Sequence, residues 1–150
     1  MVVITMNGNN HYPVKKPAHS GFSLMELLIV LVIIGLLAAA VGPTLYKRVK
    51  KAKQVAAKDQ IQSFATALDN YFIDVGEYPK NHQGLLALRN NLSSNKRWDG
   101  PYMNKEIPLD PWNNAYIYTS PGRSGGYEII SYGADGVEGG ENENQDITSW

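Results

Sequence analysis

The apolar run from Phe22 to Val41 constrains this chain more than any other feature. As an α-helix, twenty residues measure about 30 Å, which is the thickness of the hydrocarbon core of a bilayer. The run holds one ionisable residue, Glu26, close to its start. A carboxylate in a membrane span costs roughly 2.5–3.5 kcal/mol near the centre, so Glu26 requires an explanation.

Two common interpretations of the run leave something unexplained. A secretory signal peptide has an apolar core of about 7–15 residues and ends at a small-residue cleavage site. This run is longer, and Gly42-Pro43 and a further helical pattern follow it. A plain signal anchor explains the length but gives Glu26 no function.

The stretch "GFSLME", residues 21–26, resembles the type IV prepilin signal. The resemblance implies that residues 1–21 are a basic leader, carrying Lys15 and Lys16. Translation from Met6 in place of Met1 would give a shorter leader. The resemblance also implies that prepilin peptidase cleaves between Gly21 and Phe22 and methylates the new amine of Phe22.

Glu26 then has a function in assembly. Cleavage creates an α-amine on Phe22 with a reference pKa near 8, and residues four apart lie on one helical face. When subunits pack side by side, the carboxylate of one can neutralise the amine of its neighbour. The alternative is that Glu26 is a shallow residue whose carboxylate reaches the membrane surface.

The charges around the span give a conflicting orientation. The positive-inside rule counts basic residues near both ends. More basic residues follow the span than precede it, so the rule would place the C-terminal side in the cytoplasm. Lys15 and Lys16 precede the span, and it is followed by Lys47, Arg48, Lys50, Lys51 and Lys53. The prepilin resemblance implies the opposite orientation, with the globular part outside, and we adopt it.

Residues 44–76 are expected to continue the helix as an amphipathic segment, after the hydrophobic helix of residues 22–43. Gly42-Pro43 should kink or loosen the helix, Gly76 suits a C-terminal cap, and Pro79 cannot continue it. A helix over residues 22–75 would be roughly 80 Å long. Apolar residues recur at helical spacing and predict a core-facing side: Ile61, Phe64, Ala65, Leu68, Tyr71, Phe72 and Val75.

Residues 77–150 are expected to form the globular part. "NHQGLLALRNN" suggests a short helix, the stretch from Arg97 to Tyr116 suits an ordered irregular loop, and "AYIYTSPGRSGGYEIISYG" reads as a hairpin. The predicted class is α+β: a long N-terminal helix, transmembrane in its first half, packed on a small antiparallel sheet with an ordered C-terminal loop.

Several segments resemble the major pseudopilins of the type II secretion system, in the family's order: "ALDNYFIDVGEYP", "QGLLAL", "GPYM", "DPWNNAYIY", "GGYEIISYGADGVEGGE" and "DITSW". The resemblance implies a homopolymeric periplasmic pseudopilus that drives export of folded proteins. Its implied partners are minor pseudopilins, the peptidase, the inner-membrane assembly platform with its ATPase, the outer-membrane secretin and the inner membrane. A type IV or competence-type pilin is the alternative, but major type IV pilins usually close a C-terminal loop with a disulfide, and this chain has no Cys.

The acidic C-terminal stretch acquires a specific interpretation from this resemblance. In the family, the C-terminal loop binds calcium, which prefers six to eight oxygen ligands. Carried over to "SYGADGVEGGENENQDI", the implied ligands are the Tyr132 carbonyl and the side chains of Asp135, Asn142, Asn144 and Asp146, with Glu143 as a substitute. A solvated acidic loop is the alternative.

Other classes of function find little support. "GRSGG" matches G-x-S-x-G around Ser124, but it falls in a predicted hairpin turn, and His82 lies upstream of it. We therefore expect no enzyme. Basic and acidic residues number 14 each, so overall charge does not indicate a nucleic-acid partner, and we expect none. A monomeric, signal-anchored domain remains the other class, although it has no use for Glu26.

Overall fold

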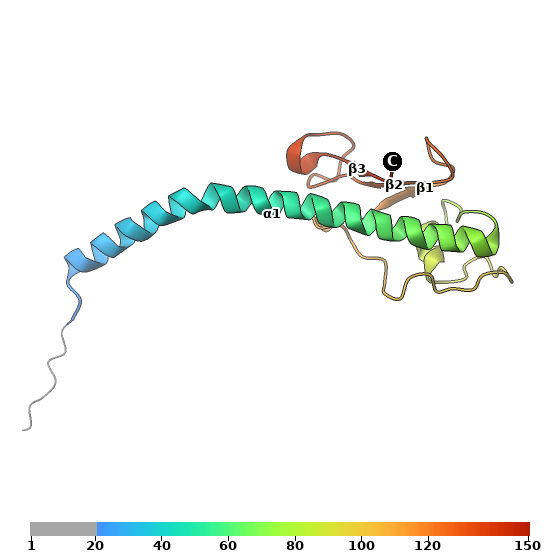
Figure 1. Ribbon diagram of the computed structural model, residues 1–150, viewed down its shortest axis with the longest axis horizontal. Coiled ribbons are helices and arrows are strands. Elements are labelled where there is room, and N and C mark those ends of the chain that lie inside the picture. Colours follow the sequence, from blue (N-terminus) through green and yellow to red (C-terminus); the bar gives the residue numbers. More distant parts are fainter. Residues whose placement is uncertain (1–20) are drawn as a thin grey trace, which may run out of the picture. The chain divides into compact units, whose positions relative to one another are not determined.

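The structure is a computed structural model that describes residues 21–150. Apart from Gly21, the expected basic leader lies outside the described residues. The chain separates into two compact units, of which the second is Gly42–Trp150. Figure 1 shows the elements in chain order, with one long helix, α1, preceding all strands.

Helix α1 comprises Leu24–Val75 and contains Pro43, so the predicted long helix is confirmed. It begins after Ser23, whose hydroxyl accepts a hydrogen bond from the Glu26 amide at 3.1 Å, as an N-cap residue does. It ends where Gly76 adopts a φ of +90° and donates its N–H to the Phe72 carbonyl at 2.8 Å. Glycine accepts this left-handed conformation without a steric penalty, which explains why the helix stops there.

Three short strands form one antiparallel sheet in the order β1-β2-β3. They are β1 (Ile117–Thr119), β2 (Glu128–Ser131) and β3 (Ile147–Thr148). Tyr118 pairs with Ile129 and Ser131 with Ile147. The predicted hairpin is confirmed as β1 and β2, whereas β3 was not predicted.

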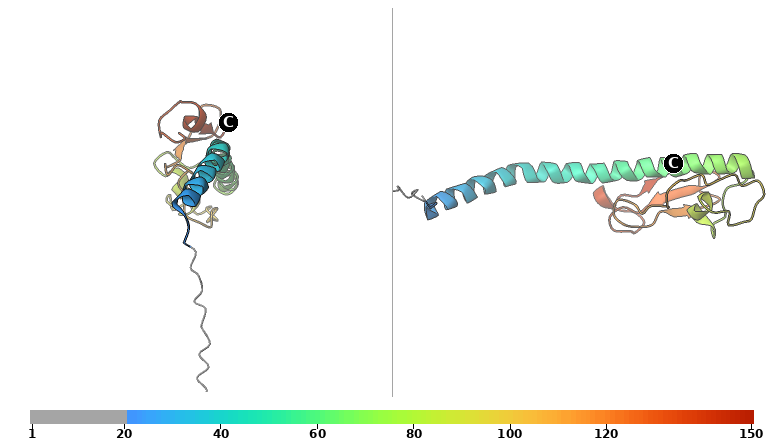
Figure 2. Two further views of the ribbon diagram at one scale, coloured as in Figure 1. Left: turned by 90° about the vertical axis from the view of Figure 1, so that its left-hand side faces the viewer. Right: turned by 90° about the horizontal axis from the view of Figure 1, so that it is seen from below.

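The core of the second unit lies between α1 and the sheet, which run side by side in Figures 1 and 2. Of the seven predicted core-facing residues of α1, five are buried: Ile61, Phe64, Leu68, Tyr71 and Val75. Ala65 is half-buried and Phe72 is 43% exposed, with its ring stacked on Tyr78 at 4.7 Å. Phe64 meets Tyr116 edge to face, with ring centroids 5.1 Å apart.

The predicted short helix is the 3₁₀ helix η1, Gly84–Leu88, and the stretch after it is irregular but ordered. The Trp98 indole N–H donates to the Ala87 carbonyl at 3.1 Å, and the Tyr102 amide donates to the Leu88 carbonyl at 2.8 Å. These bonds attach the irregular segment to η1. A second 3₁₀ turn, η2, covers Asn142–Asn144.

Candidate functional site

The predicted processing site lies directly before α1. Phe22 is 76% exposed, and the large apolar side chains that follow it in the first unit are exposed as well. This segment of α1 is long and apolar enough to cross a membrane. Glu26 lies in the first turn of α1, four residues after Phe22. An exposed apolar surface of this kind is typical of a segment that contacts a membrane or another protein.

A buried carboxylate that the sequence analysis did not single out fixes the start of the C-terminal loop. Asp110 is 5% exposed. Its Oδ1 accepts hydrogen bonds from the amides of Trp112 at 3.0 Å and Asn114 at 2.8 Å, and its Oδ2 accepts one from the Ser131 hydroxyl at 2.6 Å. Asn114 then donates its side-chain amide to the Gly133 carbonyl at 2.8 Å. The Asp-Pro-Trp-Asn-Asn turn thus holds the residues where β2 leads into the loop.

The outgoing and returning arms of the loop are in direct contact. The Ala134 amide donates to the Glu143 carbonyl at 2.9 Å, and the Gly139 amide donates to Asp146 Oδ2 at 2.9 Å. At Gly140, which has a φ of +97°, a Cβ atom would lie 2.7 Å from the Asn144 carbonyl oxygen. Only glycine permits this approach, and the result is a tight loop with carbonyl and carboxylate oxygens close together.

The structure brings some of the predicted calcium ligands together. Asn142 and Asn144 form the ends of η2, and Asp146 follows on the same arm. Asp146 Oδ1 is shielded from solvent and has no hydrogen-bond donor among the described residues. On the other arm, Tyr132 is half-buried, and Asp135 is exposed with Oδ1 accepting a bond from the Val137 amide at 3.2 Å.

Carboxylate side chains alone do not account for the predicted calcium site in the C-terminal loop. Within residues 21–150 there is no group of three or more His, Cys, Asp or Glu side chains placed to hold a metal ion. Glu143, the substitute ligand, is engaged elsewhere, because its Oε2 lies 3.0 Å from Lys50 Nζ. A cation in the loop would therefore depend on amide and backbone oxygens beside Asp135 and Asp146, which are donors that calcium accepts.

Two polar contacts join η2 to α1. Besides the Lys50–Glu143 ion pair, the Gln54 side-chain amide donates to the Asn142 carbonyl at 2.5 Å. The Glu143 hydrogen bond, followed by that of Tyr46, raises the pKa of Lys50. The returning arm of the loop therefore contacts both α1 and the outgoing arm.

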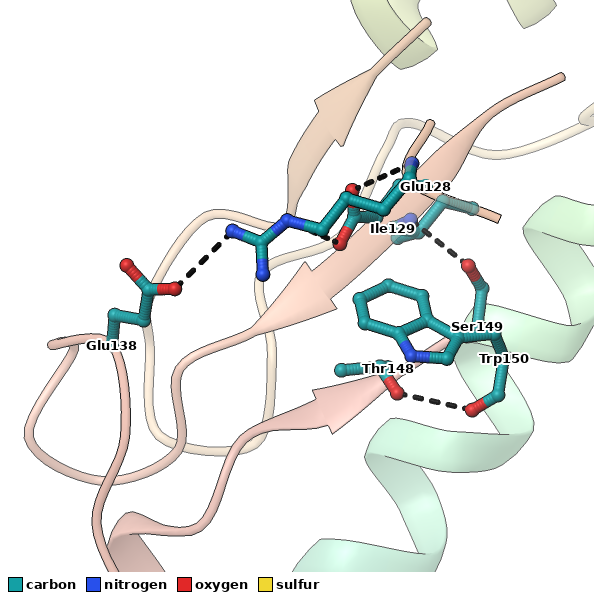
Figure 3. A network of polar contacts seen from close by, with 7 residues as sticks. Glu128, Ile129, Glu138, Thr148, Ser149 and Trp150 are labelled. Atoms are coloured by element: carbon teal, nitrogen blue, oxygen red, sulfur yellow. Dashed lines mark hydrogen bonds and ion pairs between the residues drawn. The ribbon is translucent and has the colours of Figure 1, made fainter. Parts of the chain in front are cut away.

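A third polar network occupies the turn between β1 and β2 (Figure 3). The Arg123 guanidinium lies 3.9 Å from the buried carboxylate of Glu128 and 3.3 Å from that of exposed Glu138. Ser124 is exposed in the same turn, which the Gly122–Gly125 bridge closes. A nucleophile elbow requires a strand-to-helix turn, so this motif has the wrong surroundings for catalysis.

Comparison with known proteins connects these features. The family described as type II secretion system protein G matches residues 44–150, and the prokaryotic N-terminal methylation motif matches residues 16–42. The chain is 42% identical over 139 residues to the type II secretion system core protein G of Pseudomonas aeruginosa, covering 91% of this chain and 98% of that protein. It is 41% identical over 139 residues to that of Vibrio cholerae, covering 91% and 94%.

A solved structure agrees with the sequence relatives. The crystal structure of the major pseudopilin from the type 2 secretion system of enterohaemorrhagic Escherichia coli superposes with a TM-score of 0.58 at 33% identity. The match covers 72% of this chain and 95% of that one. The matched families, the sequence relatives and the solved structure together show that the chain belongs to the protein G family of type II secretion systems, the major pseudopilins.

Proposed function

We propose that this chain is the main structural subunit of a type II secretion pseudopilus. It is inserted in the inner membrane by residues 22–43 and exposes its globular part to the periplasm. Subunits leave the membrane as a homopolymer whose growth drives folded proteins through the outer-membrane secretin. Minor pseudopilins, the inner-membrane platform and its ATPase act with it.

The observation that carries the proposal is the exposed apolar helix with Glu26 in its first turn. A single anchored domain needs only the apolar side chains. A polymer also needs a way to bury the charged amine of each processed subunit, and a carboxylate four residues away supplies it. Each subunit would contribute an amine to one neighbour and a carboxylate to another.

The proposed role of the globular part is structural, without catalysis. The C-terminal loop is proposed to hold calcium through the Tyr132 carbonyl, Asp135, Asn142, Asn144 and Asp146. The buried Oδ1 of Asp146, which lacks a donor among the described residues, supports this assignment, as does the close approach of Gly140 to Asn144. The ion would supply the cross-link between the two arms that a disulfide supplies elsewhere.

The test is mass spectrometry of the N-terminus of the chain recovered from membranes, together with the yield of sheared filaments. We expect a methylated Phe22 as the first residue. Gly21→Ile should leave an unprocessed precursor, because a bulky side chain obstructs the peptidase; a Cβ at Gly21 has no atom within 4 Å, so the fold is not disturbed.

Glu26→Ala provides the second arm of the test. We expect it to be processed and inserted normally but to assemble poorly, because an unpaired amine would be buried in the filament. Normal processing of Gly21→Ile would contradict the cleavage assignment, and undiminished filaments from Glu26→Ala would contradict the pairing.

A further inference from the structure

A groove that is both basic and apolar lies between α1 and the end of the chain. Its volume is about 360 Å³, and it is lined by Lys51, Gln54, Val55, Lys58 and residues 145–148 and 150. Lys51, Val55 and Lys58 follow one another at spacings of four and three, so they form one stripe of α1. We call this the C-terminal groove.

The apolar side chains of the C-terminal groove are only partly covered. Val55 is 50% exposed and Trp150 is 56% exposed. Trp150 is drawn with Thr148 and Ser149 in Figure 3, and the Thr148 hydroxyl donates a hydrogen bond to the Trp150 carbonyl oxygen at 3.2 Å. Trp is enriched, with Tyr and Arg, among the residues that contribute most to the binding energy of protein interfaces, so an exposed indole over a groove suits a contact surface.

The charge of the groove is positive where it is open. Lys51 and Lys58 are both exposed. Asp146 also lines the groove, but its Oδ2 accepts the Gly139 hydrogen bond and its Oδ1 is shielded from solvent. A partner should therefore present an apolar side chain between carboxylates.

The chain itself carries such a segment in residues 134–141, "ADGVEGGE". Val137 is 63% exposed, one of the most exposed large apolar side chains of the second unit. Glu138 directly follows Val137, Glu141 lies three residues after Glu138, and both glutamates are exposed. Glu138 forms an ion pair with Arg123, but both side chains are about two-thirds exposed, and such pairs contribute little and exchange readily.

We infer that the segment 134–141 of one copy docks in the C-terminal groove of the next copy, with Val137 against Val55 and Trp150 and with Glu138 and Glu141 facing Lys51 and Lys58. This contact joins two different surfaces of one chain. Such head-to-tail contacts repeat without closing when the rotation between copies does not close, and they then produce filaments. The inference rests on the proposed function and adds a contact between globular parts to the helix packing.

The absence of cysteine from the chain permits a direct test in membranes and filaments. Two full-length variants, Val55→Cys and Val137→Cys, are given tags of different size, produced together and oxidised. We expect a mixed disulfide dimer carrying both tags. Leu86→Cys in place of Val137→Cys is the control, because Leu86 is 56% exposed and lies on η1. No mixed dimer, or an equal amount with Leu86→Cys, would overturn the inference.

Charge reversal supplies an independent readout. Lys51→Glu with Lys58→Glu should lower the mixed dimer and the filament yield by roughly tenfold, since like charges face each other across the contact. Adding Glu138→Lys and Glu141→Lys to the Val137→Cys partner should restore the mixed dimer. Failure of this restoration, with the lysine variants lost from membranes instead, would assign the lysines to lipid headgroups and overturn the inference.

These experiments distinguish a failure of the docking contact from a failure of the proposed function. Filaments with methylated Phe22 but without the mixed dimer would leave the proposed function standing and remove the docking contact. Mixed dimers without any filament or N-terminal processing would support the docking contact and contradict the proposed function.

Discussion

Tyr118 in β1 and Tyr116 just before it differ in whether the hydroxyl group has a hydrogen-bond partner. The Tyr118 hydroxyl donates to the Pro79 carbonyl at 2.8 Å, whereas the buried Tyr116 hydroxyl has no partner among residues 21–150. A hydrogen bond of this kind contributes about 0.5–1.5 kcal/mol, and an unsatisfied buried group is destabilising. Tyr118→Phe should therefore lower the melting temperature by a few degrees, while Tyr116→Phe leaves it unchanged or raises it.

The same pair predicts how stability responds to alkali. Burial raises the pKa of Tyr116 and of Tyr118 to about 12. In the unfolded chain both titrate near 10, so above that pH the unfolded state binds fewer protons than the folded state, and the free energy of unfolding falls. We expect full stability below pH 10, a loss between pH 10 and 12, and a shallower loss in the double Phe variant. Chemical denaturation at each pH measures this, and an equally steep loss in that variant would contradict it.

At the scale of elements, the second half of α1 is held by one buried stripe. Leu68 is fully buried, whereas Ile73, five residues later, is 76% exposed. Leu68→Ala removes packed methyl groups and leaves a cavity, which costs about 2–5 kcal/mol. Ile73→Ala is the matched control and should stay within about 0.5 kcal/mol of the parent. Urea denaturation of a fragment that starts at Lys47 measures both, and similar losses would show that this stripe does not carry the core.

The elements that the sequence predicted are those with a local pattern. α1 has an apolar run, a helical periodicity and Gly76 to end it; the hairpin has a Pro-Gly-rich turn between β-forming residues. β3 has two residues, too few for a pattern. Asp110 was missed because its partners come from its own turn and from Ser131, and no local spacing indicates that burial. The metal ligands of the loop came from family resemblance and remain a prediction.

For the molecule as a whole, calcium is the most informative variable. A ligand that binds only the folded state stabilises it by about 2.7 kcal/mol at a hundredfold excess over Kd. In a domain near 100 residues, 1 kcal/mol moves the melting temperature by roughly 4–8 °C. The fragment from Lys47 should therefore melt many degrees higher in millimolar calcium than in chelator, measured by calorimetry.

Asp135→Ala should remove most of the difference between calcium and chelator, and it should reduce secretion because a loosened loop weakens subunit packing. Glu106→Ala, an exposed carboxylate outside the loop, should keep the full difference. Magnesium should substitute poorly, since it requires compact octahedral geometry and retains its waters. Equal melting temperatures with calcium and with chelator would contradict the calcium site and favour the alternative interpretation, a solvated acidic loop.

The bond between Gln54 and Asn142 joins residues 88 positions apart. The entropic cost of closing a chain segment grows with its length, and proteins dominated by contacts of high sequence separation fold more slowly. The helix, the hairpin and the core between them can all form before the returning arm reaches α1. We therefore expect Lys50 and Gln54 to acquire their partners after the core has formed, and we expect a protease that cleaves within residues 134–146 to distinguish newly made subunits from mature ones.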